Sequence, residues 1–260
     1  FERNTLRDNY FVSVLVTIWR SSLSNMVRNN LFANNSASST ARATYETSYA
    51  NNTKIYHNTF VNNHVPREVC LRTGCTEGVE IKNNVFWPTP GSYCLDVARG
   101  CTENLVCASN VFFSDFKQDG YPPGFGFSTT ENTEIVGSWN GKQMTTDDWN
   151  KASQNNTGNG YAFEGPGLDK NMRLAAGSLC VDRGAPGLAG EDIDGRPRPL
   201  GAGCDIGAHE HGTPDPGRSL AGARAAELDG QQMASDAPLH WAACQGDLPT
   251  ITYRADRSLH

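Results

Sequence analysis

The sequence contains few charged residues and no long apolar run. Only 19% of its 260 residues are charged, and 28 acidic against 22 basic residues give a formal net charge of −6. No basic patch or stripe stands out, which argues against nucleic acid as the main partner. The longest apolar stretch, from Phe11 to Trp19, is too short and too mixed to span a bilayer, so no transmembrane segment is expected.

Several catalytic and metal-binding motifs are also missing. The sequence has no phosphate-binding loop, no HExxH pair and no residue order typical of a Ser-His-Asp triad. None of its eight cysteines shows CxxC spacing, so a zinc site or a thioredoxin-like centre has little support. The one pair of adjacent aspartates, Asp147-Asp148, lies at an expected helix start, so paired strand carboxylates for glycoside hydrolysis are not found.

The sequence does contain a repeat. An Asn-x-Phe triplet begins at Asn30, Asn58, Asn84 and Asn110, at spacings of 28, 26 and 26 residues, and a weaker copy begins at Asn4. Short stretches of alternating apolar and polar residues precede the triplets, which is typical of half-buried strands. No pattern of a crossover helix lies between the copies, which argues against a Rossmann or barrel fold.

A fixed period of this length predicts an all-β fold, the right-handed parallel β-helix, in which successive coils stack as a solenoid. Asparagine suits the corner of a coil, because it tolerates left-handed backbone and its stacked copies can form a ladder of amide hydrogen bonds. The phenylalanine two residues later is expected to point inward and stack on its copies. The alternative is a β-sandwich with Asn-rich turns.

Two coils can be aligned directly, because Gly-Cys-Thr-Glu occurs at residues 74–77 and again at 100–103. When Cys70-Leu71-Arg72 is matched with Cys94-Leu95-Asp96, the leucines face the core. Arg72 and Asp96 are then expected to be outward neighbours on adjacent coils.

The cysteines bear on the cellular compartment. The alignment places Cys70 over Cys94 and Cys75 over Cys101, so each pair is expected either to form a disulfide or to remain a stack of reduced thiols. Because disulfides persist in oxidising compartments, bridged pairs would indicate a secreted or cell-surface protein.

The pattern divides the chain into three regions. Residues 1–120 are expected to form coils of about 26 residues each, and residues 121–211 to form irregular final coils and a C-terminal cap. Residues 212–260 show no period and are expected to be a flexible extension. Because the chain begins inside a coil at Asn4, without a cap on that coil, we expect it to be the C-terminal portion of a longer protein.

A short helix is expected in the second region. The series Thr145-Thr146-Asp147-Asp148-Trp149 is typical of a helix start, with Thr146 as the capping residue and both aspartates in the first turn.

Three segments rich in Gly, Pro and Asp follow this helix. They are Leu-Ala-Ala-Gly-Ser-Leu-Cys-Val-Asp-Arg-Gly at 174–184, Asp-Ile-Asp-Gly-Arg-Pro-Arg-Pro at 192–199 and Gly-Cys-Asp-Ile-Gly-Ala-His-Glu at 203–210. From about Met144 to Glu210 the series resembles the terminal segment of bacterial right-handed parallel β-helix repeat proteins of the pectate-lyase-like superfamily. This sequence departs from the family at Arg183, where alanine is more frequent, and at His209, where an aromatic residue or Asp often precedes the Glu.

We expect this terminal segment to cover the open end of the solenoid, because its residues suit tight turns. Cys180 and Cys204 lie in its two halves and are predicted to form a disulfide. Asp192, Asp194 and Asp205 together could hold a calcium ion, the one candidate cofactor. The alternative for these aspartates is hydrogen bonding to turn amides and to Arg196 or Arg198.

The resemblance implies that an outward groove along one parallel sheet acts on acidic polysaccharide. A lyase needs a base and a cation that neutralises the uronate carboxylate. The outward candidates for catalysis are Arg72, Asp96 and Arg99. The candidates for substrate binding are Glu46, Glu68, Tyr93 and Tyr121. The alternative for Arg72 and Asp96 is a surface ion pair, and His57 is expected to be a solvated loop residue.

We therefore expect a secreted or cell-surface monomer that interacts with polysaccharide. It would be a lyase if it is an enzyme, with glycoside hydrolase as the second choice. The alternative is a non-enzymatic, adhesin-like structural β-helix, because a fold does not decide a function. An enzyme should show at least three charged residues converging around Arg72 and Asp96, whereas a spacer should show an even polar surface there.

Overall fold

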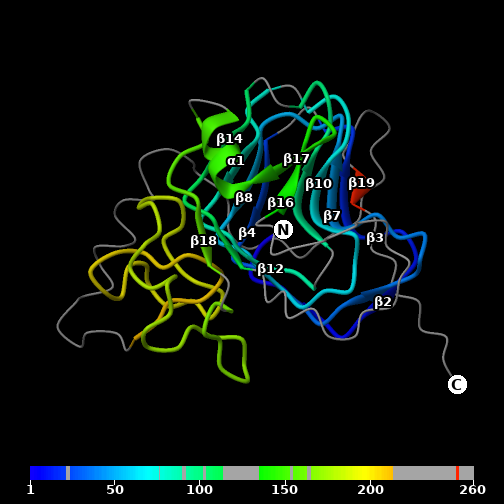
Figure 1. Cartoon of the computed structure of the whole chain (residues 1–260). Coiled ribbons are helices and arrows are strands. Elements are labelled where there is room, and N and C mark those ends of the chain that lie inside the picture. The colour runs from blue at the N-terminus through cyan, green and yellow to red at the C-terminus, as the bar shows by residue number, and fades with distance from the viewer. Residues whose placement is uncertain are drawn as a thin grey trace, which may run out of the picture.

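The computed structural model of the chain describes residues 1–21, 24–75, 77–89, 92–101, 104–113, 135–152, 155–162, 165–212 and 250–251. Over these residues the protein is mostly β, a parallel β-solenoid of about 4 turns with one short helix (Figure 1). The predicted flexible extension at 212–260 lies almost entirely outside the described residues. In the described part of the chain no helix has the length and apolar character needed to cross a membrane.

Successive turns contribute their strands to three long sheets and one short one. Sheet A consists of β4 (Asn25–Arg28), β8 (Thr53–Tyr56), β11 (Glu80–Lys82) and β14 (Val106–Ala108). Sheet B consists of β1 (Thr5–Arg7), β5 (Leu31–Ala33), β9 (Thr59–Val61), β12 (Val85–Trp87), β15 (Val111–Phe113) and β18 (Gly160–Ala162). Sheet C pairs β2 (Tyr10–Phe11) with β6 (Ser36–Ala37).

Sheet D is the third long sheet. It consists of β3 (Val14–Trp19), β7 (Ala43–Ser48), β10 (Arg67–Leu71), β13 (Tyr93–Val97), β16 (Ile135–Trp139), β17 (Lys142–Thr145) and β19 (Thr250–Ile251). Its pairings are parallel except for β16 with β17 and β19 with β3, which are antiparallel.

The predicted asparagine ladder is confirmed, and it is longer than the repeat showed. Each ladder amide donates from Nδ2 to Oδ1 of the asparagine one coil further on, at 2.9–3.1 Å. The members are Asn4, Asn30, Asn58, Asn84, Asn110 and Asn159. Each of these Oδ1 atoms also accepts a hydrogen bond from the backbone N–H of the ladder asparagine one coil earlier. The left-handed backbone belongs to the residue before each of the four central ladder asparagines, namely Asn29, His57, Asn83 and Ser109.

A second ladder, which the sequence pattern did not predict, lies at the other end of sheet B. Asn9 donates to Asn35 at 2.9 Å and Asn35 donates to Asn63 at 2.8 Å. Asn35 and Asn63 are fully buried. Both ends of the first three sheet B strands, β1, β5 and β9, are therefore held by stacked amides.

The predicted phenylalanine stack is also confirmed. Phe32, Phe60, Phe86 and Phe112 are fully buried, and their ring centroids lie 4.7, 5.1 and 5.5 Å apart with nearly parallel planes. Stacked rings at this spacing fill the inside of the solenoid continuously from coil to coil.

The helix α1 (Thr146–Ala152) packs at the last turn of the stack. Trp149 is fully buried in the core and meets Trp139 edge-on, with centroids 5.2 Å apart. The capping residue is Thr145 rather than the predicted Thr146. Its Oγ1 accepts the Asp148 N–H at 3.1 Å, while the Asp148 carboxylate accepts the Thr145 N–H, a reciprocal pair typical of a capping box.

Residues 165–212 do not lie across an end of the solenoid, as predicted for a cap. They lie along its side, against the outer face of sheet B, where Ile206 and Leu168 pack on apolar side chains of the strands. The side chains that they cover are Leu31, Ala33, Val61, Val85, Val111 and Phe113. Since these strands are apolar on both faces, they need a cover on the outside as well as a core on the inside. We call residues 165–212 the cover segment (yellow-green to orange in Figure 1).

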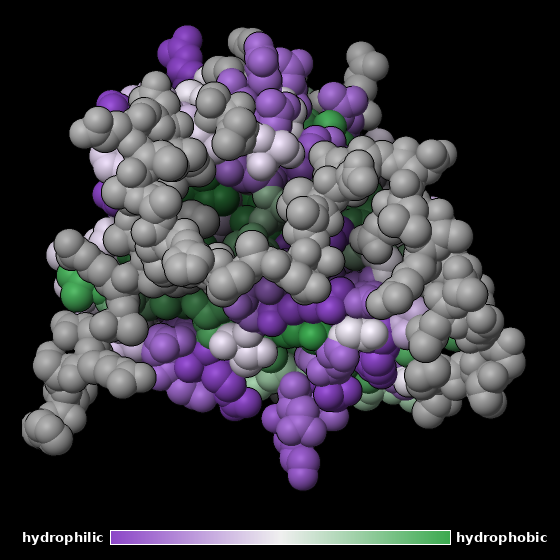
Figure 2. Space-filling model, turned by 180° about the vertical axis from the view of Figure 1, so that it is seen from behind, coloured by the Kyte–Doolittle hydropathy of each residue, from purple (hydrophilic) through white to green (hydrophobic). Residues whose placement is uncertain are grey.

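The side of the molecule that faces away from the viewer in Figure 1 carries polar and apolar areas together. Figure 2 shows hydrophilic side chains gathered along its upper and lower parts, with hydrophobic side chains visible between them. Large hydrophobic side chains with more than half of their area exposed include Trp19 at 55% and Tyr49 at 52%. The Arg20 guanidinium lies over both rings, at 5.6 Å and 6.0 Å from their centroids.

We predict that Asn84→Ala lowers the free energy of unfolding by about 3 kcal/mol, because the change leaves buried hydrogen-bond donors and acceptors without a partner. The Asn84 amide donates to Ile55 O, Lys82 O and Asn110 Oδ1, and its Oδ1 accepts from the backbone and side chain of Asn58. Urea unfolding measures the loss. Asn171→Ala is the control, because Asn171 is exposed, and this variant should stay within about 0.5 kcal/mol of the parent. Equal effects of the two changes would contradict a structural role for the ladder.

Candidate functional site

A row of polar side chains crosses the face of sheet D that points away from the core. Backbone pairing aligns one residue from each of five neighbouring strands. Side-chain alternation places these five residues on one face of the sheet, while the buried Val69, Leu71 and Leu95 lie on the other face. The row consists of Thr17, Glu46, Cys70, Asp96 and Ser138. It is the candidate site, and we call it the sheet D row.

The predicted faces are confirmed, but the predicted register is wrong by two residues. Asp96 lies opposite Cys70 rather than Arg72, because β10 and β13 pair at an offset of 26 residues. The Asp96 carboxylate is bound by Arg67 Nε, a residue that the sequence analysis did not select. A shift of two residues leaves every side chain on its predicted face, which explains why the alternation pattern alone could not detect the error.

Three arginines surround the two carboxylates of the sheet D row. Arg42 Nε lies 3.0 Å from Glu46, and a terminal nitrogen of Arg72 lies 3.9 Å from the same carboxylate. Arg67 holds Asp96. The side chains of Arg42 and Arg72 are each 46% exposed, whereas that of Glu46 is only 6% exposed. The site therefore presents guanidinium groups outward over neutralised carboxylates, with one positive charge in excess.

The other candidates on this sheet are scattered. Arg99 is exposed in the turn after β13, and Tyr93 at the start of β13 is half-buried, with its hydroxyl accepting a hydrogen bond from Gln143 Nε2 at 2.9 Å. Tyr121 lies outside the described residues. Burial raises the pKa of the Cys70 thiol to about 12, so this thiol is protonated at neutral pH and is no nucleophile there.

Glu68 is a buried structural carboxylate and not an exposed substrate contact. Its side chain is fully buried, and one oxygen accepts hydrogen bonds from Thr44 Oγ1 at 2.7 Å and Asn63 Nδ2 at 3.0 Å. Desolvation raises its pKa from the ordinary value of 4.5 to about 8, although both hydrogen bonds oppose this shift. Glu68 therefore carries a proton in the folded protein at neutral pH.

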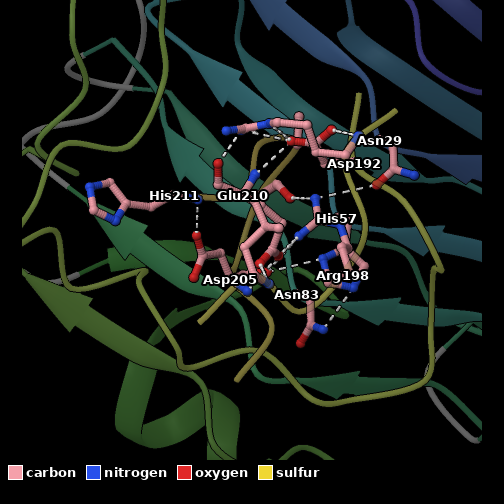
Figure 3. A network of polar contacts seen from close by, with 12 residues as sticks. Asn29, His57, Asn83, Asp192, Arg198, Asp205, Glu210 and His211 are labelled. Carbon is pink, nitrogen blue, oxygen red and sulfur yellow. Dashed lines mark hydrogen bonds and ion pairs between the residues drawn. The ribbon is translucent and has the colours of Figure 1, made fainter. Parts of the chain in front are cut away.

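A buried ion pair within the cover segment lies against the solenoid. Arg198 and Glu210 pair directly, and both side chains have no exposed area (Figure 3). Arg198 also donates to Gly207 O at 2.7 Å and Asp205 O at 3.1 Å, while Glu210 accepts the Asp205 N–H at 2.8 Å. Arg198 further reaches Asn29 Oδ1 at 3.4 Å, which joins the pair to the first coils. Buried charges are tolerated when they are paired and hydrogen-bonded in this way.

His57 lies in the same network and is not the solvated loop residue that we expected. It is fully buried, and its Nδ1 faces Asp205 O at 3.1 Å, so Nδ1 must carry the proton and donate it. Its Nε2 then accepts from Asn83 Nδ2 at 3.0 Å. Burial lowers the pKa of His57 well below its ordinary value, so the ring is neutral and connects the cover segment to the asparagine corner.

The aspartates of the cover segment bind turn amides and an arginine, which was the alternative to a calcium site. Asp192 accepts three backbone N–H groups, from Asp194, Arg196 and Glu210, and also binds the Arg196 guanidinium. Asp205 accepts the N–H groups of Asp182 and His211.

A different group brings possible metal-binding atoms together. Asp192 and Asp194 have ligand atoms within 4.8 Å of one another and of a nitrogen of His209, but Asp205 does not belong to this group. Arg173 lies 2.9 Å and Arg196 lies 3.9 Å from the Asp194 carboxylate. These guanidinium groups already compensate the negative charge, so the arrangement fits a salt-bridged turn better than a cation site.

The predicted disulfide between Cys180 and Cys204 is not formed. Both residues are buried free thiols, as are the five other cysteines in the described part of the chain. The structure therefore adds no support to the compartment that the disulfide argument favoured.

The sequence matches no protein-family model, no curated protein and no solved structure. The resemblance to the pectate-lyase-like superfamily therefore remains an expectation, whereas the parallel β-solenoid fold is shown.

We predict that the stability of the parent protein falls relative to that of Glu68→Gln as the pH rises from about 4.5 to about 8. Between the unfolded and folded pKa values of Glu68, the folded state holds one proton more than the unfolded state. Each pH unit in this window therefore costs the parent about 1 kcal/mol, and the glutamine variant does not titrate. Urea unfolding at several pH values measures the difference, and parallel curves for the two proteins would contradict the prediction.

We predict that Arg198→Met lowers the free energy of unfolding by about 3–5 kcal/mol, because it leaves the Glu210 carboxylate buried without its partner. The double variant Arg198→Met/Glu210→Gln should recover part of this loss. Arg7→Met is the control, since Arg7 pairs with Asp8 at 2.9 Å on the surface, and it should change little. Chemical unfolding measures all three variants, and a loss no greater than that of Arg7→Met would argue against a stabilising role for the ion pair.

Proposed function

We propose that this protein binds an acidic polysaccharide along the outer face of sheet D, as a secreted or cell-surface protein of right-handed β-helix type. The observation that carries the proposal is the sheet D row itself. Five charged side chains lie in this row or beside it, whereas a spacer was expected to show an even polar surface there. They are Arg42, Glu46, Arg67, Arg72 and Asp96.

Arg72 is the group best suited to meet a carboxylate of the polymer. Its side chain is 46% exposed, and it lies 3.9 Å from Glu46, beyond hydrogen-bond distance. The planar guanidinium can form two parallel hydrogen bonds with a uronate carboxylate. Arg42 and Arg67 hold the two carboxylates of the site, which lowers the repulsion that an anionic polymer would meet there.

An exposed aromatic side chain lies on the same face of the sheet. Trp19 ends β3 two residues after Thr17, so alternation places both on the outer face, and Trp19 is 55% exposed. Trp19 pairs with Ser48, and the Arg72 N–H bonds to the adjacent Thr47 O. Trp19 and Arg72 thus lie two strands apart, roughly 10 Å. A flat ring and a cation at this separation suit a polymer of sugar rings with carboxylates.

The arrangement supports binding better than cleavage. A lyase base must accept a proton, and in this site Glu46 and Asp96 are both bound by arginines. The activity assay described below therefore tests the lyase and hydrolase predictions.

We predict that Arg72→Ala weakens binding to polygalacturonate about tenfold, through the loss of one charge-assisted contact of about 1.5 kcal/mol. Isothermal titration calorimetry at fixed low salt measures the affinity. Arg7→Ala is the matched control, because Arg7 lies in sheet B with 45% exposure and should leave the affinity unchanged.

Three results would decide against the proposal. These are no binding by the parent protein to polygalacturonate or alginate, equal binding to a neutral glucan, or equal losses for Arg72→Ala and Arg7→Ala. In parallel, ultraviolet absorbance reports an unsaturated product and a reducing-sugar assay reports hydrolysis. If the parent protein forms either product, the proposed binding function would be wrong and the protein would be an enzyme.

A further inference from the structure

Cys75 and Cys101 occupy equivalent positions in neighbouring coils. Before this turn, Leu71 pairs with Val97, and after it Glu80 pairs with Val106, so the offset is 26 residues on both sides. The same offset separates the two cysteines. Equivalent residues of neighbouring coils lie one strand spacing apart, about 4.8 Å, which is within the range of Cα separations that a disulfide spans, about 4.4–6.8 Å.

The two thiols are in contact. The Cys75 and Cys101 side chains hydrogen-bond to each other, and the Cys75 Sγ is also directed at Thr47 O at 3.6 Å. Both residues are buried, at 2% and 1% exposure, yet exposed residues lie close to them in the chain, namely Thr73 two positions before Cys75 and Gly100 directly before Cys101. The thiols therefore lie just beneath the surface at a turn.

The hydrogen bond divides the roles of the two sulfurs. It lowers the pKa of Cys75 and raises the pKa of Cys101, because the Cys101 thiol acts as donor to the Cys75 sulfur. A thiolate is the reactive form in disulfide exchange, so Cys75 is the attacking group of the pair.

The two cysteines in strands of sheet D lack such a partner in register. Cys70 lies opposite Asp96 and Glu46, and by the same pairing Cys94 lies opposite Glu68. Burial raises the pKa of both thiols. The structure thus separates the two pairs that the sequence alignment left equivalent, and only Cys75 and Cys101 remain as stacked neighbours.

We propose that Cys75 and Cys101 are a site of covalent modification, where an inter-coil disulfide forms by exchange with a small-molecule disulfide. The Cys75 thiolate attacks one sulfur of the oxidant, breaks its S–S bond and releases one thiolate. Cys101 then loses its proton and attacks the Cys75 sulfur, which releases the second oxidant thiolate. Two protein thiols are oxidised, one oxidant disulfide is reduced to two thiols, and the Cys101 proton goes to solvent or to the departing thiolate.

This link would fix two coils at the turn that follows Arg72. The closed loop contains about 26 residues, and a disulfide of this loop length stabilises a protein mainly by restricting the unfolded chain. The inference does not depend on polysaccharide binding, and its test does not use a carbohydrate.

The experiment incubates the folded, reduced protein with excess oxidised glutathione, blocks the remaining thiols at low pH and digests with trypsin and a Glu-specific protease. The sequence gives two short cysteine peptides, Thr-Gly-Cys-Thr-Glu at 73–77 and Gly-Cys-Thr-Glu at 100–103. Mass spectrometry should find these two peptides linked, with the loss of two hydrogen atoms, and the link should disappear after reduction.

The variants Cys75→Ser and Cys101→Ser separate the two steps. Cys101→Ser should retain glutathione on residue 75, whereas Cys75→Ser should react slowly. Oxidation should raise the melting temperature of the parent protein by about 5–10 °C and leave the double serine variant unchanged.

Three results obtained with the parent protein alone would overturn the inference. These are a persistent mixed disulfide on Cys75 of the parent protein, linkage of Cys75 to a different cysteine, or two fully alkylated peptides after oxidation. Linkage only after denaturation in urea would likewise show that the folded structure does not bring the two thiols together.

Discussion

The stacked asparagine amides at the corner between sheets A and B are the constraint on which the rest of the structure depends. A chain that turns sharply inside a protein exposes backbone N–H and C=O groups that no regular strand can pair. Here each ladder Oδ1 accepts a backbone N–H from the neighbouring coil, and each Nδ2 continues to the next amide. Because the ladder repeats once per coil, it sets the spacing of the coils, and the phenylalanine rings follow at that spacing. The polar corner and the apolar stack are thus two consequences of one register.

The cover segment shows a different way to bury polar groups. Sheet B is apolar on both faces, so its outer side chains need a second layer, and a segment rich in turns supplies it. Turns bring backbone groups that must be paired, and Asp192 and Asp205 accept several of them. Arg198 and Glu210 then place a charged pair beneath this layer, joined to the corner through Asn29. A buried ion pair of this kind contributes little to stability by itself, but a buried charge without its partner destabilises the protein strongly. The pair therefore favours the one packing of the cover segment in which both charges meet.

Unlike the outer face of sheet B, the outer face of sheet D is not covered by any described layer of regular structure, and its side chains are polar. Parallel strands align like positions of successive coils, so a polar residue at one position becomes part of a row. That row brings Glu46 within reach of Arg72 and Asp96 within reach of Arg67, and each arginine lies at the end of a neighbouring strand. A solenoid can therefore assemble a charged site from residues about one coil apart in sequence, each of which is unremarkable alone. The same alignment stacks Cys75 and Cys101.

The sequence by itself determined the coil: its period, its inward phenylalanines, its asparagine corner and the face of each sheet D side chain. These features depend on alternation and hydrogen bonding that repeat locally. It also contained signals that the period obscured. Asn159-Gly160-Tyr161 continues the Asn-x-aromatic pattern, but 49 residues separate Asn159 from Asn110. The offset between neighbouring coils rises from 26 residues at β15 to 42 at β16, and β17 and α1 lengthen it further.

Only the tertiary structure decided which partners lie opposite each other. The register of Arg72 and Asp96 depended on a two-residue shift that alternation cannot detect, and the position of the cover segment depended on contacts such as Thr59 with Ala208, 149 residues apart. Contacts over such distances depend on how the whole stack is folded, because no local pattern in the chain records them.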